Sequence, residues 1–309
     1  MTAQLKQLRP HSRFLSVPTG TAHAYDAAGH DYLAYADGDA AQPFNFNSRY
    51  CFADLEIWRR LDATLQRLAA NNQRSLRLLD AGCGPGTWLR RTVLRARELG
   101  FTSIEAHGID ISPAMLALAR ETTAFIDDPA ISIQLEEGDL TEALNFETNE
   151  FDITLCLYGV FNHLPAASHD RVAAELSRIT GGTLFVTVRT VGSLPTIYVD
   201  GLDHARAFHQ DNKIDWMEVD MVDGRHIGFP SHLFTADELR ALFQPYVGGT
   251  ALLGLDVFHS RFATNAHWNP PSVDADDSFE DDLVQLEQRY ACDPRFINRA
   301  AHILLVGER

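Results

Sequence analysis

The sequence lacks the features of secreted, membrane-spanning and zinc-clustered proteins. Its four cysteines stand far apart without a Cys-x-x-Cys pair, so neither a disulfide framework nor a zinc cage is indicated. No apolar run approaches the ~20 residues that cross a bilayer, and the first residues show no apolar signal-peptide core. We therefore expect a cytoplasmic protein without a membrane partner.

Basic residues are also scarce. The 26 Lys and Arg residues stand against 42 Asp and Glu residues, which gives a formal net charge of −16. Such a charge repels nucleic-acid phosphates unless basic residues cluster on one face, and the sequence holds no such cluster. We expect no nucleic-acid partner. The densest acidic run, residues 274–282, lacks the glycine and spacing of a calcium loop and is typical of a helix start, where the helix dipole favours carboxylates.

From residue 75 onward, short apolar runs alternate with helix-like segments. Strand-like runs cover 77–81, 103–110, 131–139, 151–158, 181–190, 250–262 and 301–309. This alternation is typical of right-handed crossovers in a mostly parallel sheet that is covered on both faces. We therefore predict an α/β fold, a doubly wound, Rossmann-like, mostly parallel seven-stranded sheet with helices on both faces.

Two regions lack this alternation of strand-like and helix-like segments, and they suggest the domain organisation. Residues 1–74 are aromatic and polar until a helical pattern at 53–70, and we predict an N-terminal helical and aromatic lid there. The core domain is expected over 75–309, with inserts at about 190–232 and 263–298. The first insert, between the fifth and sixth strands, is irregular by pattern and rich in histidine, and loops of this length usually carry function.

The glycine-rich stretch LLDAGCGPGTWLRR, residues 78–91, stands on a strand-to-helix turn. Glycines there let the backbone approach a ligand, and the free N–H groups of the next helix can donate to it. A P-loop is excluded because no Lys-Ser/Thr pair follows Gly86, and a dinucleotide turn fits poorly because position 87 is threonine. Asp80 would direct a negative charge at the turn, which repels phosphate and favours a cationic amino-acid group.

Four motifs in this order resemble those of class I S-adenosylmethionine-dependent methyltransferases of the small-molecule type. They are DAGCGPGT, GIDIS, EEGDL and FDITLCLYGVFNHLP. The resemblance covers residues 75–190 motif by motif, continues more loosely through HLFTADELRALF and the last two strands, and leaves 1–74 and 190–228 unexplained. It implies S-adenosyl-L-methionine as cofactor, S-adenosyl-L-homocysteine as product, and a small-molecule substrate. A nicotinamide oxidoreductase stays open as an alternative.

The resemblance also implies a set of cofactor-binding residues. Asp80, Gly82, Cys83, Gly84, Thr87 and Trp88 would lie around the methionine part, Asp110 would accept from the ribose hydroxyls, Asp139 would accept from the adenine amino group, and Ile111, Met115 and Leu140 would pack on adenine. Plainer interpretations remain for three of them. Asp110 could cap a helix, Asp139 could stabilise a turn, and Met115 could belong to the core.

The transferred methyl group is expected beside Leu157 and Tyr158, at the end of the fourth strand, with Asn162 and His163 following. An oxygen or protonated nitrogen acceptor must lose a proton, and His163 is the candidate base. A thioether acceptor has no proton to lose, so positioning alone could suffice. His163 could instead have a structural role.

Specificity is expected from the two regions outside the core. The aromatic stretch 32–50 supplies Tyr32, Tyr35, Arg49 and Tyr50, as a lid over the ligands or as a docked N-terminal arm. The insert supplies His209, Trp216, His226 and His232, and Arg189 precedes it. These histidines lack His-x-His or His-x-x-x-His spacing, so we expect no metal.

The mixed arginine, acidic and aromatic content of the insert suits a zwitterion. The sequence therefore favours an amino-acid-like or amine acceptor, methylated on nitrogen or sulfur, for example a methionine thioether. O-methylation of a natural product or phenol is the alternative within the family. A non-catalytic S-adenosylmethionine-binding module is the alternative of another class. The oligomeric state is left open, and a homo-oligomer is compatible with the sequence.

Overall fold

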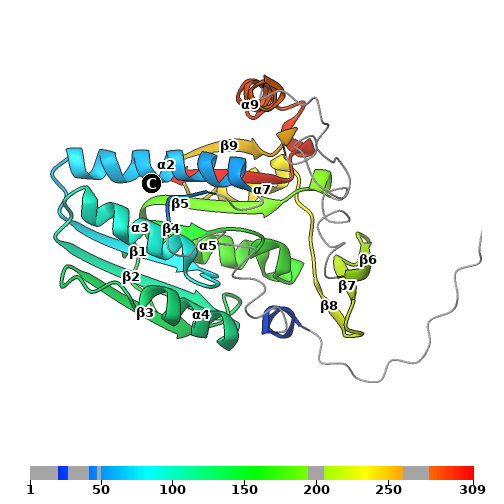
Figure 1. Cartoon of the computed structure of the whole chain (residues 1–309), viewed down its shortest axis with the longest axis horizontal. Helices are drawn as coiled ribbons and strands as arrows, with labels where there is room; N and C mark the ends of the chain where they lie inside the picture. Colours follow the sequence, from blue (N-terminus) through cyan, green and yellow to red (C-terminus); the bar gives the residue numbers. More distant parts are fainter. Residues whose placement is uncertain (1–19, 27–41, 47–49, 194–204, 260–277) are drawn as a thin grey trace, which may run out of the picture.

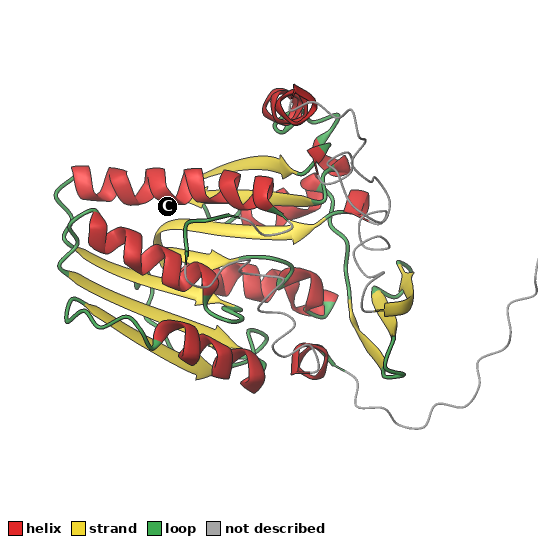
Figure 2. Cartoon of the chain, viewed as in Figure 1, coloured by secondary structure: helices red, strands yellow, loops and turns green. Residues whose placement is uncertain are grey.

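The computed structural model describes residues 20–26, 42–46, 50–193, 205–259 and 278–309. Its centre is a seven-stranded sheet in the order β3-β2-β1-β4-β5-β10-β9 (Figures 1 and 2). The strands are β1 (Ser75–Ala81), β2 (Ser103–Asp110), β3 (Ile131–Glu137), β4 (Phe151–Cys156), β5 (Thr180–Arg189), β9 (Gly249–Leu255) and β10 (His302–Glu308). The first five pair in parallel, whereas β10 runs antiparallel to both β5 and β9. The predicted fold class is confirmed.

Helices cover both faces of this sheet. They are α2 (Cys51–Ala70), α3 (Thr87–Glu98), α4 (Pro113–Thr123), α5 (His169–Ile179) and α7 (Ala236–Phe243), while α9 (Ser278–Tyr290) stands beyond the edge strand β9 in Figure 1. One core joins α2 and α3 to the strands, and a second core on the other face joins α5 and α7 to them. No helix in these described ranges is long and apolar enough to span a membrane.

Local sequence signals explain where several helices begin. Ser112 caps α4 by accepting from the backbone N–H of Met115 at 3.2 Å, and Pro113 takes the first helical position. Thr235 and Glu238 form a reciprocal capping box at the start of α7.

Two strands end earlier than their apolar runs predict, because the backbone turns into the left-handed region. The run at 151–158 ends as strand β4 at Cys156, and Tyr158 follows with φ 54° and Gly159 with φ 85°. The run at 250–262 ends as strand β9 at Leu255, and Asp256 follows with φ 58°. A strand cannot continue through such a residue, so the chain leaves the sheet at both points.

The insert at about 190–232, whose sequence pattern predicts no regular structure, contains a separate antiparallel sheet. Strands β6 (Ala205–Asp211), β7 (Trp216–Met221) and β8 (His226–Pro230) pair in that order. In Figure 1 this sheet stands beyond the carboxyl ends of the parallel strands, on the same side as a short helix at 21–26. Helix α2 belongs to the segment 1–74 that is predicted as a lid, but it packs into the core of the sheet. The domain limits at 74 and 75 remain predictions.

Candidate functional site

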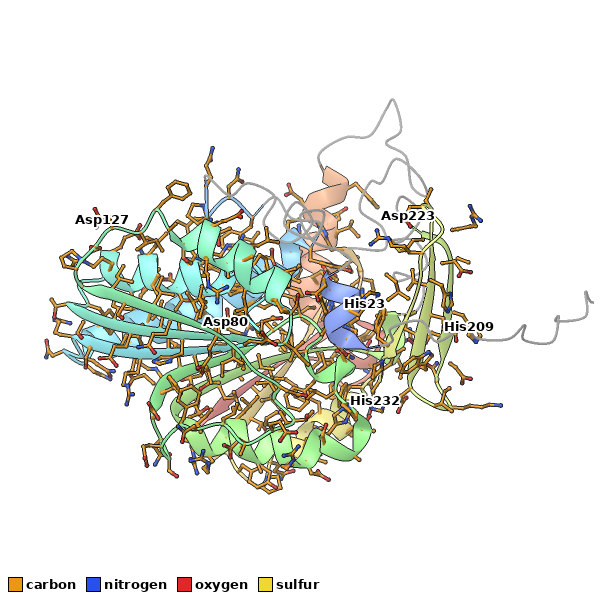
Figure 3. All side chains as sticks on the ribbon, turned by 90° about the horizontal axis from the view of Figure 1, so that it is seen from below. His23, Asp80, Asp127, His209, Asp223 and His232 are labelled. Carbon is orange, nitrogen blue, oxygen red and sulfur yellow. The ribbon has the colours of Figure 1, made fainter. Side chains whose placement is uncertain are left out.

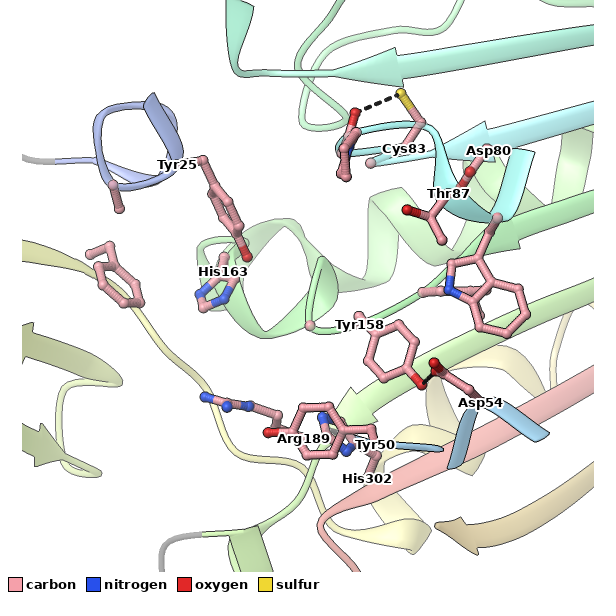
Figure 4. Close-up of a pocket in the computed structure, with 18 of the residues that line it drawn as sticks. Tyr25, Tyr50, Asp54, Asp80, Cys83, Thr87, Tyr158, His163, Arg189 and His302 are labelled. Carbon is pink, nitrogen blue, oxygen red and sulfur yellow. Dashed lines mark hydrogen bonds between the residues drawn. The ribbon is translucent and has the colours of Figure 1, made fainter. Parts of the chain in front are cut away.

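Two adjoining cavities lie at the carboxyl ends of β1, β2 and β4, where open parallel sheets bind ligands. The larger cavity has a volume of about 320 Å³ and the smaller one about 250 Å³. Both are lined by Tyr25, Gly82, Gly84, Leu157, Tyr158 and His163. They therefore form one continuous site, and Figure 4 shows its larger half.

The glycine turn after β1 brings bare backbone to both cavities. Gly82 has φ 80°, and a Cβ atom there would lie 2.4 Å from the Val160 side chain. The backbone N–H groups of Gly82 and Cys83 both donate to the carbonyl of Ile109, at 2.7 and 2.9 Å. Burial, and then the charge of Asp80, raises the pKa of the Cys83 thiol, so this thiol stays protonated beside the ligand space.

The smaller cavity combines two carboxylates with apolar side chains. Asp110 accepts from the backbone N–H groups of Gly84 and Ser112, at 2.8 and 2.9 Å, and burial raises its pKa. Ser112, not Asp110, caps the following helix. Asp139 accepts from the backbone N–H of Thr141 at 2.8 Å, which is the turn role considered from sequence. Carboxylate oxygens hold more than one hydrogen bond, so both groups can still accept from hydroxyl or amino donors of a ligand.

The larger cavity contains a buried carboxylate that is only partly satisfied. Asp80 is 2% exposed, and one of its oxygens has no hydrogen-bond partner among the described residues. Burial, and then the nearby charge of Asp110, raises the pKa of Asp80 to about 7. The Thr87 hydroxyl is likewise buried without a partner in that part of the chain. An unsatisfied acid and hydroxyl at a cavity wall favour a cationic ligand group.

Aromatic side chains form the wall beside Asp80. The left-handed backbone of Tyr158 sets its ring against Tyr50 and Trp88, with centroids 6.1 and 6.2 Å away. The Tyr158 hydroxyl donates to the Asp54 carboxylate of α2 (Figure 4). Burial, and then the Asp54 charge, raises the pKa of Tyr158 well above its usual value, so the phenol stays neutral. Such a wall can also attract a cation through the ring faces.

His163 is a neutral imidazole at the junction of the two cavities. Its Nδ1 lies 2.9 Å from the carbonyl of Pro230, and a carbonyl only accepts, so Nδ1 carries the proton and Nε2 is an acceptor. Burial lowers the pKa of His163 to about 4. Nε2 lies beside Gly159, where an added Cβ atom would stand 3.6 Å from it. The rings of Tyr25 and Phe229 pack on the imidazole, with centroids 5.8 and 5.1 Å away.

Arg189, at the end of β5, and His302, at the start of β10, complete the far wall of the larger cavity. The two residues stand opposite each other in the antiparallel register. Burial, and then the Arg189 charge, lowers the pKa of His302 to about 3. The Tyr50 and Tyr158 rings contact the His302 imidazole edge to face, with centroids 5.0 and 5.5 Å away.

The structure brings the expected cofactor residues together with one exception. Those lining at least one cavity are Asp80, Gly82, Cys83, Gly84, Thr87, Trp88, Asp110, Ile111, Asp139, Leu140 and Leu157. Met115 lines neither and is fully buried in α4, as the core interpretation has it.

The expected substrate residues divide into three groups. Tyr50, Tyr158 and Arg189 line the larger cavity. Asn162, His209, Trp216, His226 and His232 line neither cavity. Tyr32, Tyr35 and Arg49 lie outside the described residues.

The residues that line neither cavity have other partners or face solvent. The Asn162 amide bonds the backbone of Arg189 and His232 and so ties β5 to the end of the insert. His232 lies between two carboxylates, those of Asp215 at 2.9 Å and Glu238 at 2.7 Å. His209 is exposed on β6, at the edge of the molecule in Figure 3.

The remaining two insert residues contact neighbours within the insert. His226 bonds Asp220 at 2.7 Å, and Trp216 packs on Gly228.

Several residues of the larger cavity were not expected from sequence: Tyr25, Asp54, Val219, Met221, Ile227, Phe229 and His302. The alternation of apolar residues in VDM and HIGF could have indicated one lining face of the insert. Nothing local marks Asp54 or His302, because the fold alone brings α2 and β10 to the cavity. In the residues that the structure describes, no group of three or more His, Cys, Asp or Glu side chains could hold a metal ion.

The sheet order, the glycine turn and the cavities at its carboxyl edge define a class I methyltransferase fold. Residues 78–181 match a family model described as a methyltransferase domain, so this part of the chain is similar to S-adenosylmethionine-dependent methyltransferases.

Two relatives illustrate this likeness. A probable methyltransferase from Aspergillus luteorubrus, ltbC, is 33% identical over 153 residues, which are 46% of this chain and 51% of the relative. The chain thus matches about half the length of this curated relative. Magnesium protoporphyrin IX methyltransferase (ChlM) from Synechocystis PCC 6803, solved with bound SAH, shares the fold with a TM-score of 0.51 at 14% identity, over 93% of this chain and 97% of that one.

Proposed function

We propose that this protein transfers a methyl group from S-adenosylmethionine to a small molecule. The observation that carries the proposal is the position of three of the four carboxylates around one continuous site: Asp110 and Asp139 in the smaller cavity, and the partly satisfied Asp80 in the larger one, whereas Asp54 binds the Tyr158 hydroxyl. A nucleoside with hydroxyl and amino donors suits the first pair, and a cationic amino-acid group suits Asp80. A dinucleotide would instead bring a pyrophosphate close to Asp80, which repels it.

These residues would hold the cofactor in two parts. Asp110 would accept from the ribose hydroxyls, Asp139 from the adenine amino group, and the apolar Ile111 and Leu140 would pack on the base. Asp80 and Thr87 would bind the methionine end, whose positive charges satisfy the buried carboxylate.

S-adenosylmethionine, when bound, supplies a methyl group on a positively charged sulfur, which an acceptor attacks in line. The protein then has to orient the acceptor and exclude water. The helix at 21–26 helps to close the site, because the Thr21 hydroxyl donates to the His163 carbonyl at 3.1 Å and Gly20 N–H donates to the Gly228 carbonyl at 3.2 Å. His163 Nε2 is available to accept a proton from an oxygen or nitrogen acceptor.

The chemical class of the methyl acceptor is a separate question from the cofactor. The amino-acid-like or amine acceptor that the sequence favours depended on polar residues of the insert reading a zwitterion. Among the described insert residues, the histidines and Trp216 line neither cavity, so these side chains give a zwitterionic acceptor no support. A phenol or related oxygen acceptor gains support from the apolar lining of β7 and β8.

Calorimetry with S-adenosylmethionine and NAD(P)H side by side tests the cofactor. We expect binding of S-adenosylmethionine with the wild type and at least tenfold weaker binding with Asp80→Asn, since a charged hydrogen bond is worth about 1.5–3 kcal/mol. Preference for the dinucleotide would refute the proposal. Asp127→Asn, an exposed aspartate, is the matched control and should bind as the wild type does.

Transfer is tested separately from binding. The protein is incubated with a whole-cell extract and methyl-labelled S-adenosylmethionine, and products are identified by mass spectrometry. Label in a small molecule is expected. Binding without any turnover would support the non-catalytic binding module, and label only in RNA, protein or lipid would contradict the small-molecule acceptor.

A further inference from the structure

Two histidines line the larger cavity, and one of them has a buried nitrogen without a partner. The Nδ1 of His163 donates to the Pro230 carbonyl, as described above. His302 is only 3% exposed, and its Nδ1 has no hydrogen-bond partner among the described residues. Buried polar atoms are normally hydrogen-bonded, so a group of the ligand is the expected partner of this nitrogen.

The fold fixes the position of the His302 ring. Because β10 runs antiparallel to β5, its first residue lies at the carboxyl end of β5, and on the other side it pairs with Leu255 of β9. The rings of Tyr50 and Tyr158 contact the imidazole edge to face. The Tyr158 hydroxyl is bound to Asp54 instead of to the imidazole. A ring held by two neighbouring strands and two aromatic side chains is a rigid point of attachment for a ligand.

The His302 ring suits a hydroxyl group of the ligand. Burial is the larger cause of its pKa of about 3, so the ring is neutral at neutral pH. A neutral imidazole has one nitrogen that donates and one that accepts, and a hydroxyl group can pair with Nδ1 in either tautomer. An ammonium only donates and a carboxylate only accepts, and each would also lose its hydration shell at this buried ring.

The insert sheet adds an apolar face to the same cavity. Val219 and Met221 of β7 and Ile227 and Phe229 of β8 line it. Side chains alternate between the two faces of a strand, and Val219 stands opposite Ile227 in the register, so these four side chains share one face. Phe229 also packs on the His163 ring. An aromatic or other apolar body fits this wall.

We propose that His302 determines the specificity for the acceptor, which is an uncharged aromatic compound with two hydroxyl groups, one methylated beside His163 and the other bonded to Nδ1 of His302. His163 and His302 stand apart in Figure 4, so the acceptor needs two polar groups to reach both rings. This inference rests on the proposed methyltransferase function and names the acceptor class of the same site.

The proposed arrangement gives a balanced reaction step. The oxygen of the first hydroxyl forms a bond to the methyl carbon while the carbon–sulfur bond breaks, and the electron pair of that bond stays on sulfur. The hydroxyl proton passes to Nε2 of His163, which already donates from Nδ1 to Pro230. This hydroxyl becomes strongly acidic as its oxygen binds the methyl group, so a weakly basic imidazole can accept the proton in the transition state. The second hydroxyl keeps its proton, and the product is the monomethyl ether.

Ligands that differ by one hydroxyl group test the acceptor class. Phenol is compared with resorcinol, and 2-naphthol is compared with 2,6-dihydroxynaphthalene and 2,7-dihydroxynaphthalene. Their affinities for the wild-type protein saturated with S-adenosylhomocysteine are measured by calorimetry, and methyl transfer to each is measured with labelled cofactor. At least one diol should bind at least about fivefold more tightly than its parent, which is the size of effect that one net hydrogen bond gives, and it should be converted to its monomethyl ether. If no diol binds more tightly than its parent, the inference is overturned.

Variants identify the residue that binds the second hydroxyl. His302→Phe keeps a ring beside Tyr50 and Tyr158 but has no nitrogen, so it should remove the advantage of the diol over its parent. His302→Asn places an amide near the position of Nδ1 and should retain part of this advantage. His209→Phe, the same substitution at an exposed histidine of β6 that lines neither cavity, should leave the advantage unchanged.

The difference between the two ligands separates specificity from a structural role. If His302 only supported the cavity wall, His302→Phe would weaken the binding of diol and parent equally, and that result contradicts the inference. The comparison within one variant also cancels the symmetry advantage of a diol. If His302→Phe fails to fold, His302→Leu takes its place, and the absence of a gain in the wild type still overturns the inference.

The failures of the two proposals are distinguishable. If S-adenosylmethionine does not bind, the proposed function fails. If it binds and its methyl group reaches an acceptor whose affinity does not depend on a second hydroxyl and on His302, the proposed function stands and the acceptor inference alone fails.

Discussion

The buried Asp80 carboxylate should make the ligand-free protein less stable at alkaline pH. Its pKa is 3.8 in an unfolded chain and about 7 in the fold. Between these values the folded protein keeps a proton that the unfolded chain releases. This group therefore leaves the stability of the folded state undiminished below pH 3.8. The free energy of unfolding then falls as the pH rises from 3.8 through about 7.

The magnitude follows from the size of this pKa difference. The pKa of Asp80 differs by about three between the unfolded chain and the fold. This difference lowers the free energy of unfolding at pH 8 by at most about 4 kcal/mol relative to acid pH. Asp80→Asn keeps the shape and removes the charge, so it should be more stable than the wild type at pH 8 by up to this amount. For a chain of this size, 4 kcal/mol corresponds to a rise in Tm of roughly 6 °C.

The assay is thermal unfolding of the ligand-free wild type, Asp80→Asn and the exposed control Asp127→Asn at pH 5 and pH 8. The stabilisation by Asp80→Asn should be larger at pH 8, and the control should show no such difference. Equal effects of Asp80→Asn at both pH values would refute the reasoning. The same variant should bind S-adenosylmethionine weakly, and in the wild type this affinity should increase up to about pH 7 as the carboxylate ionises.

Three further predictions concern the framework of the site. Gly82→Ala places a side chain at φ 80° against Val160, and it should lower the free energy of unfolding by at least about 2 kcal/mol, measured by denaturant titration. Glu287→Gln should lower it by about 2 kcal/mol, because the buried carboxylate accepts three backbone N–H bonds after β9 and an amide cannot replace all of them. Thr235→Ala should remove the capping box of α7 and lower the free energy of unfolding by about 1 kcal/mol, with cofactor affinity unchanged. A larger loss would mean that the Thr235 side chain stabilises more than the start of this helix.

The cofactor half of the site could be predicted from sequence because its residues lie at, or directly after, the carboxyl ends of consecutive parallel strands. Asp80, Asp110 and Asp139 each follow this rule, and the topology then brings them to one edge of the sheet. Ser112 could be assigned as the helix cap because capping depends on neighbours within one turn.

The acceptor half could not be predicted in the same way. Which face of the insert meets the cavity depends on the register of β6, β7 and β8, and the polar residues that looked functional, such as His226 and Trp216, lie on the other side from Val219. His302 reaches the cavity only because β10 pairs with β5 across more than a hundred residues of sequence.

The position of β10 inside the sheet also has a consequence for the order in which the protein folds during synthesis. The five parallel strands are complete once Arg189 has been made, and they can pair with one another at that stage. Among the described residues β9 pairs only with β10, so it has to wait for the last residues of this sequence. Because β10 also carries His302, the wall of the larger cavity cannot close until this strand has left the ribosome.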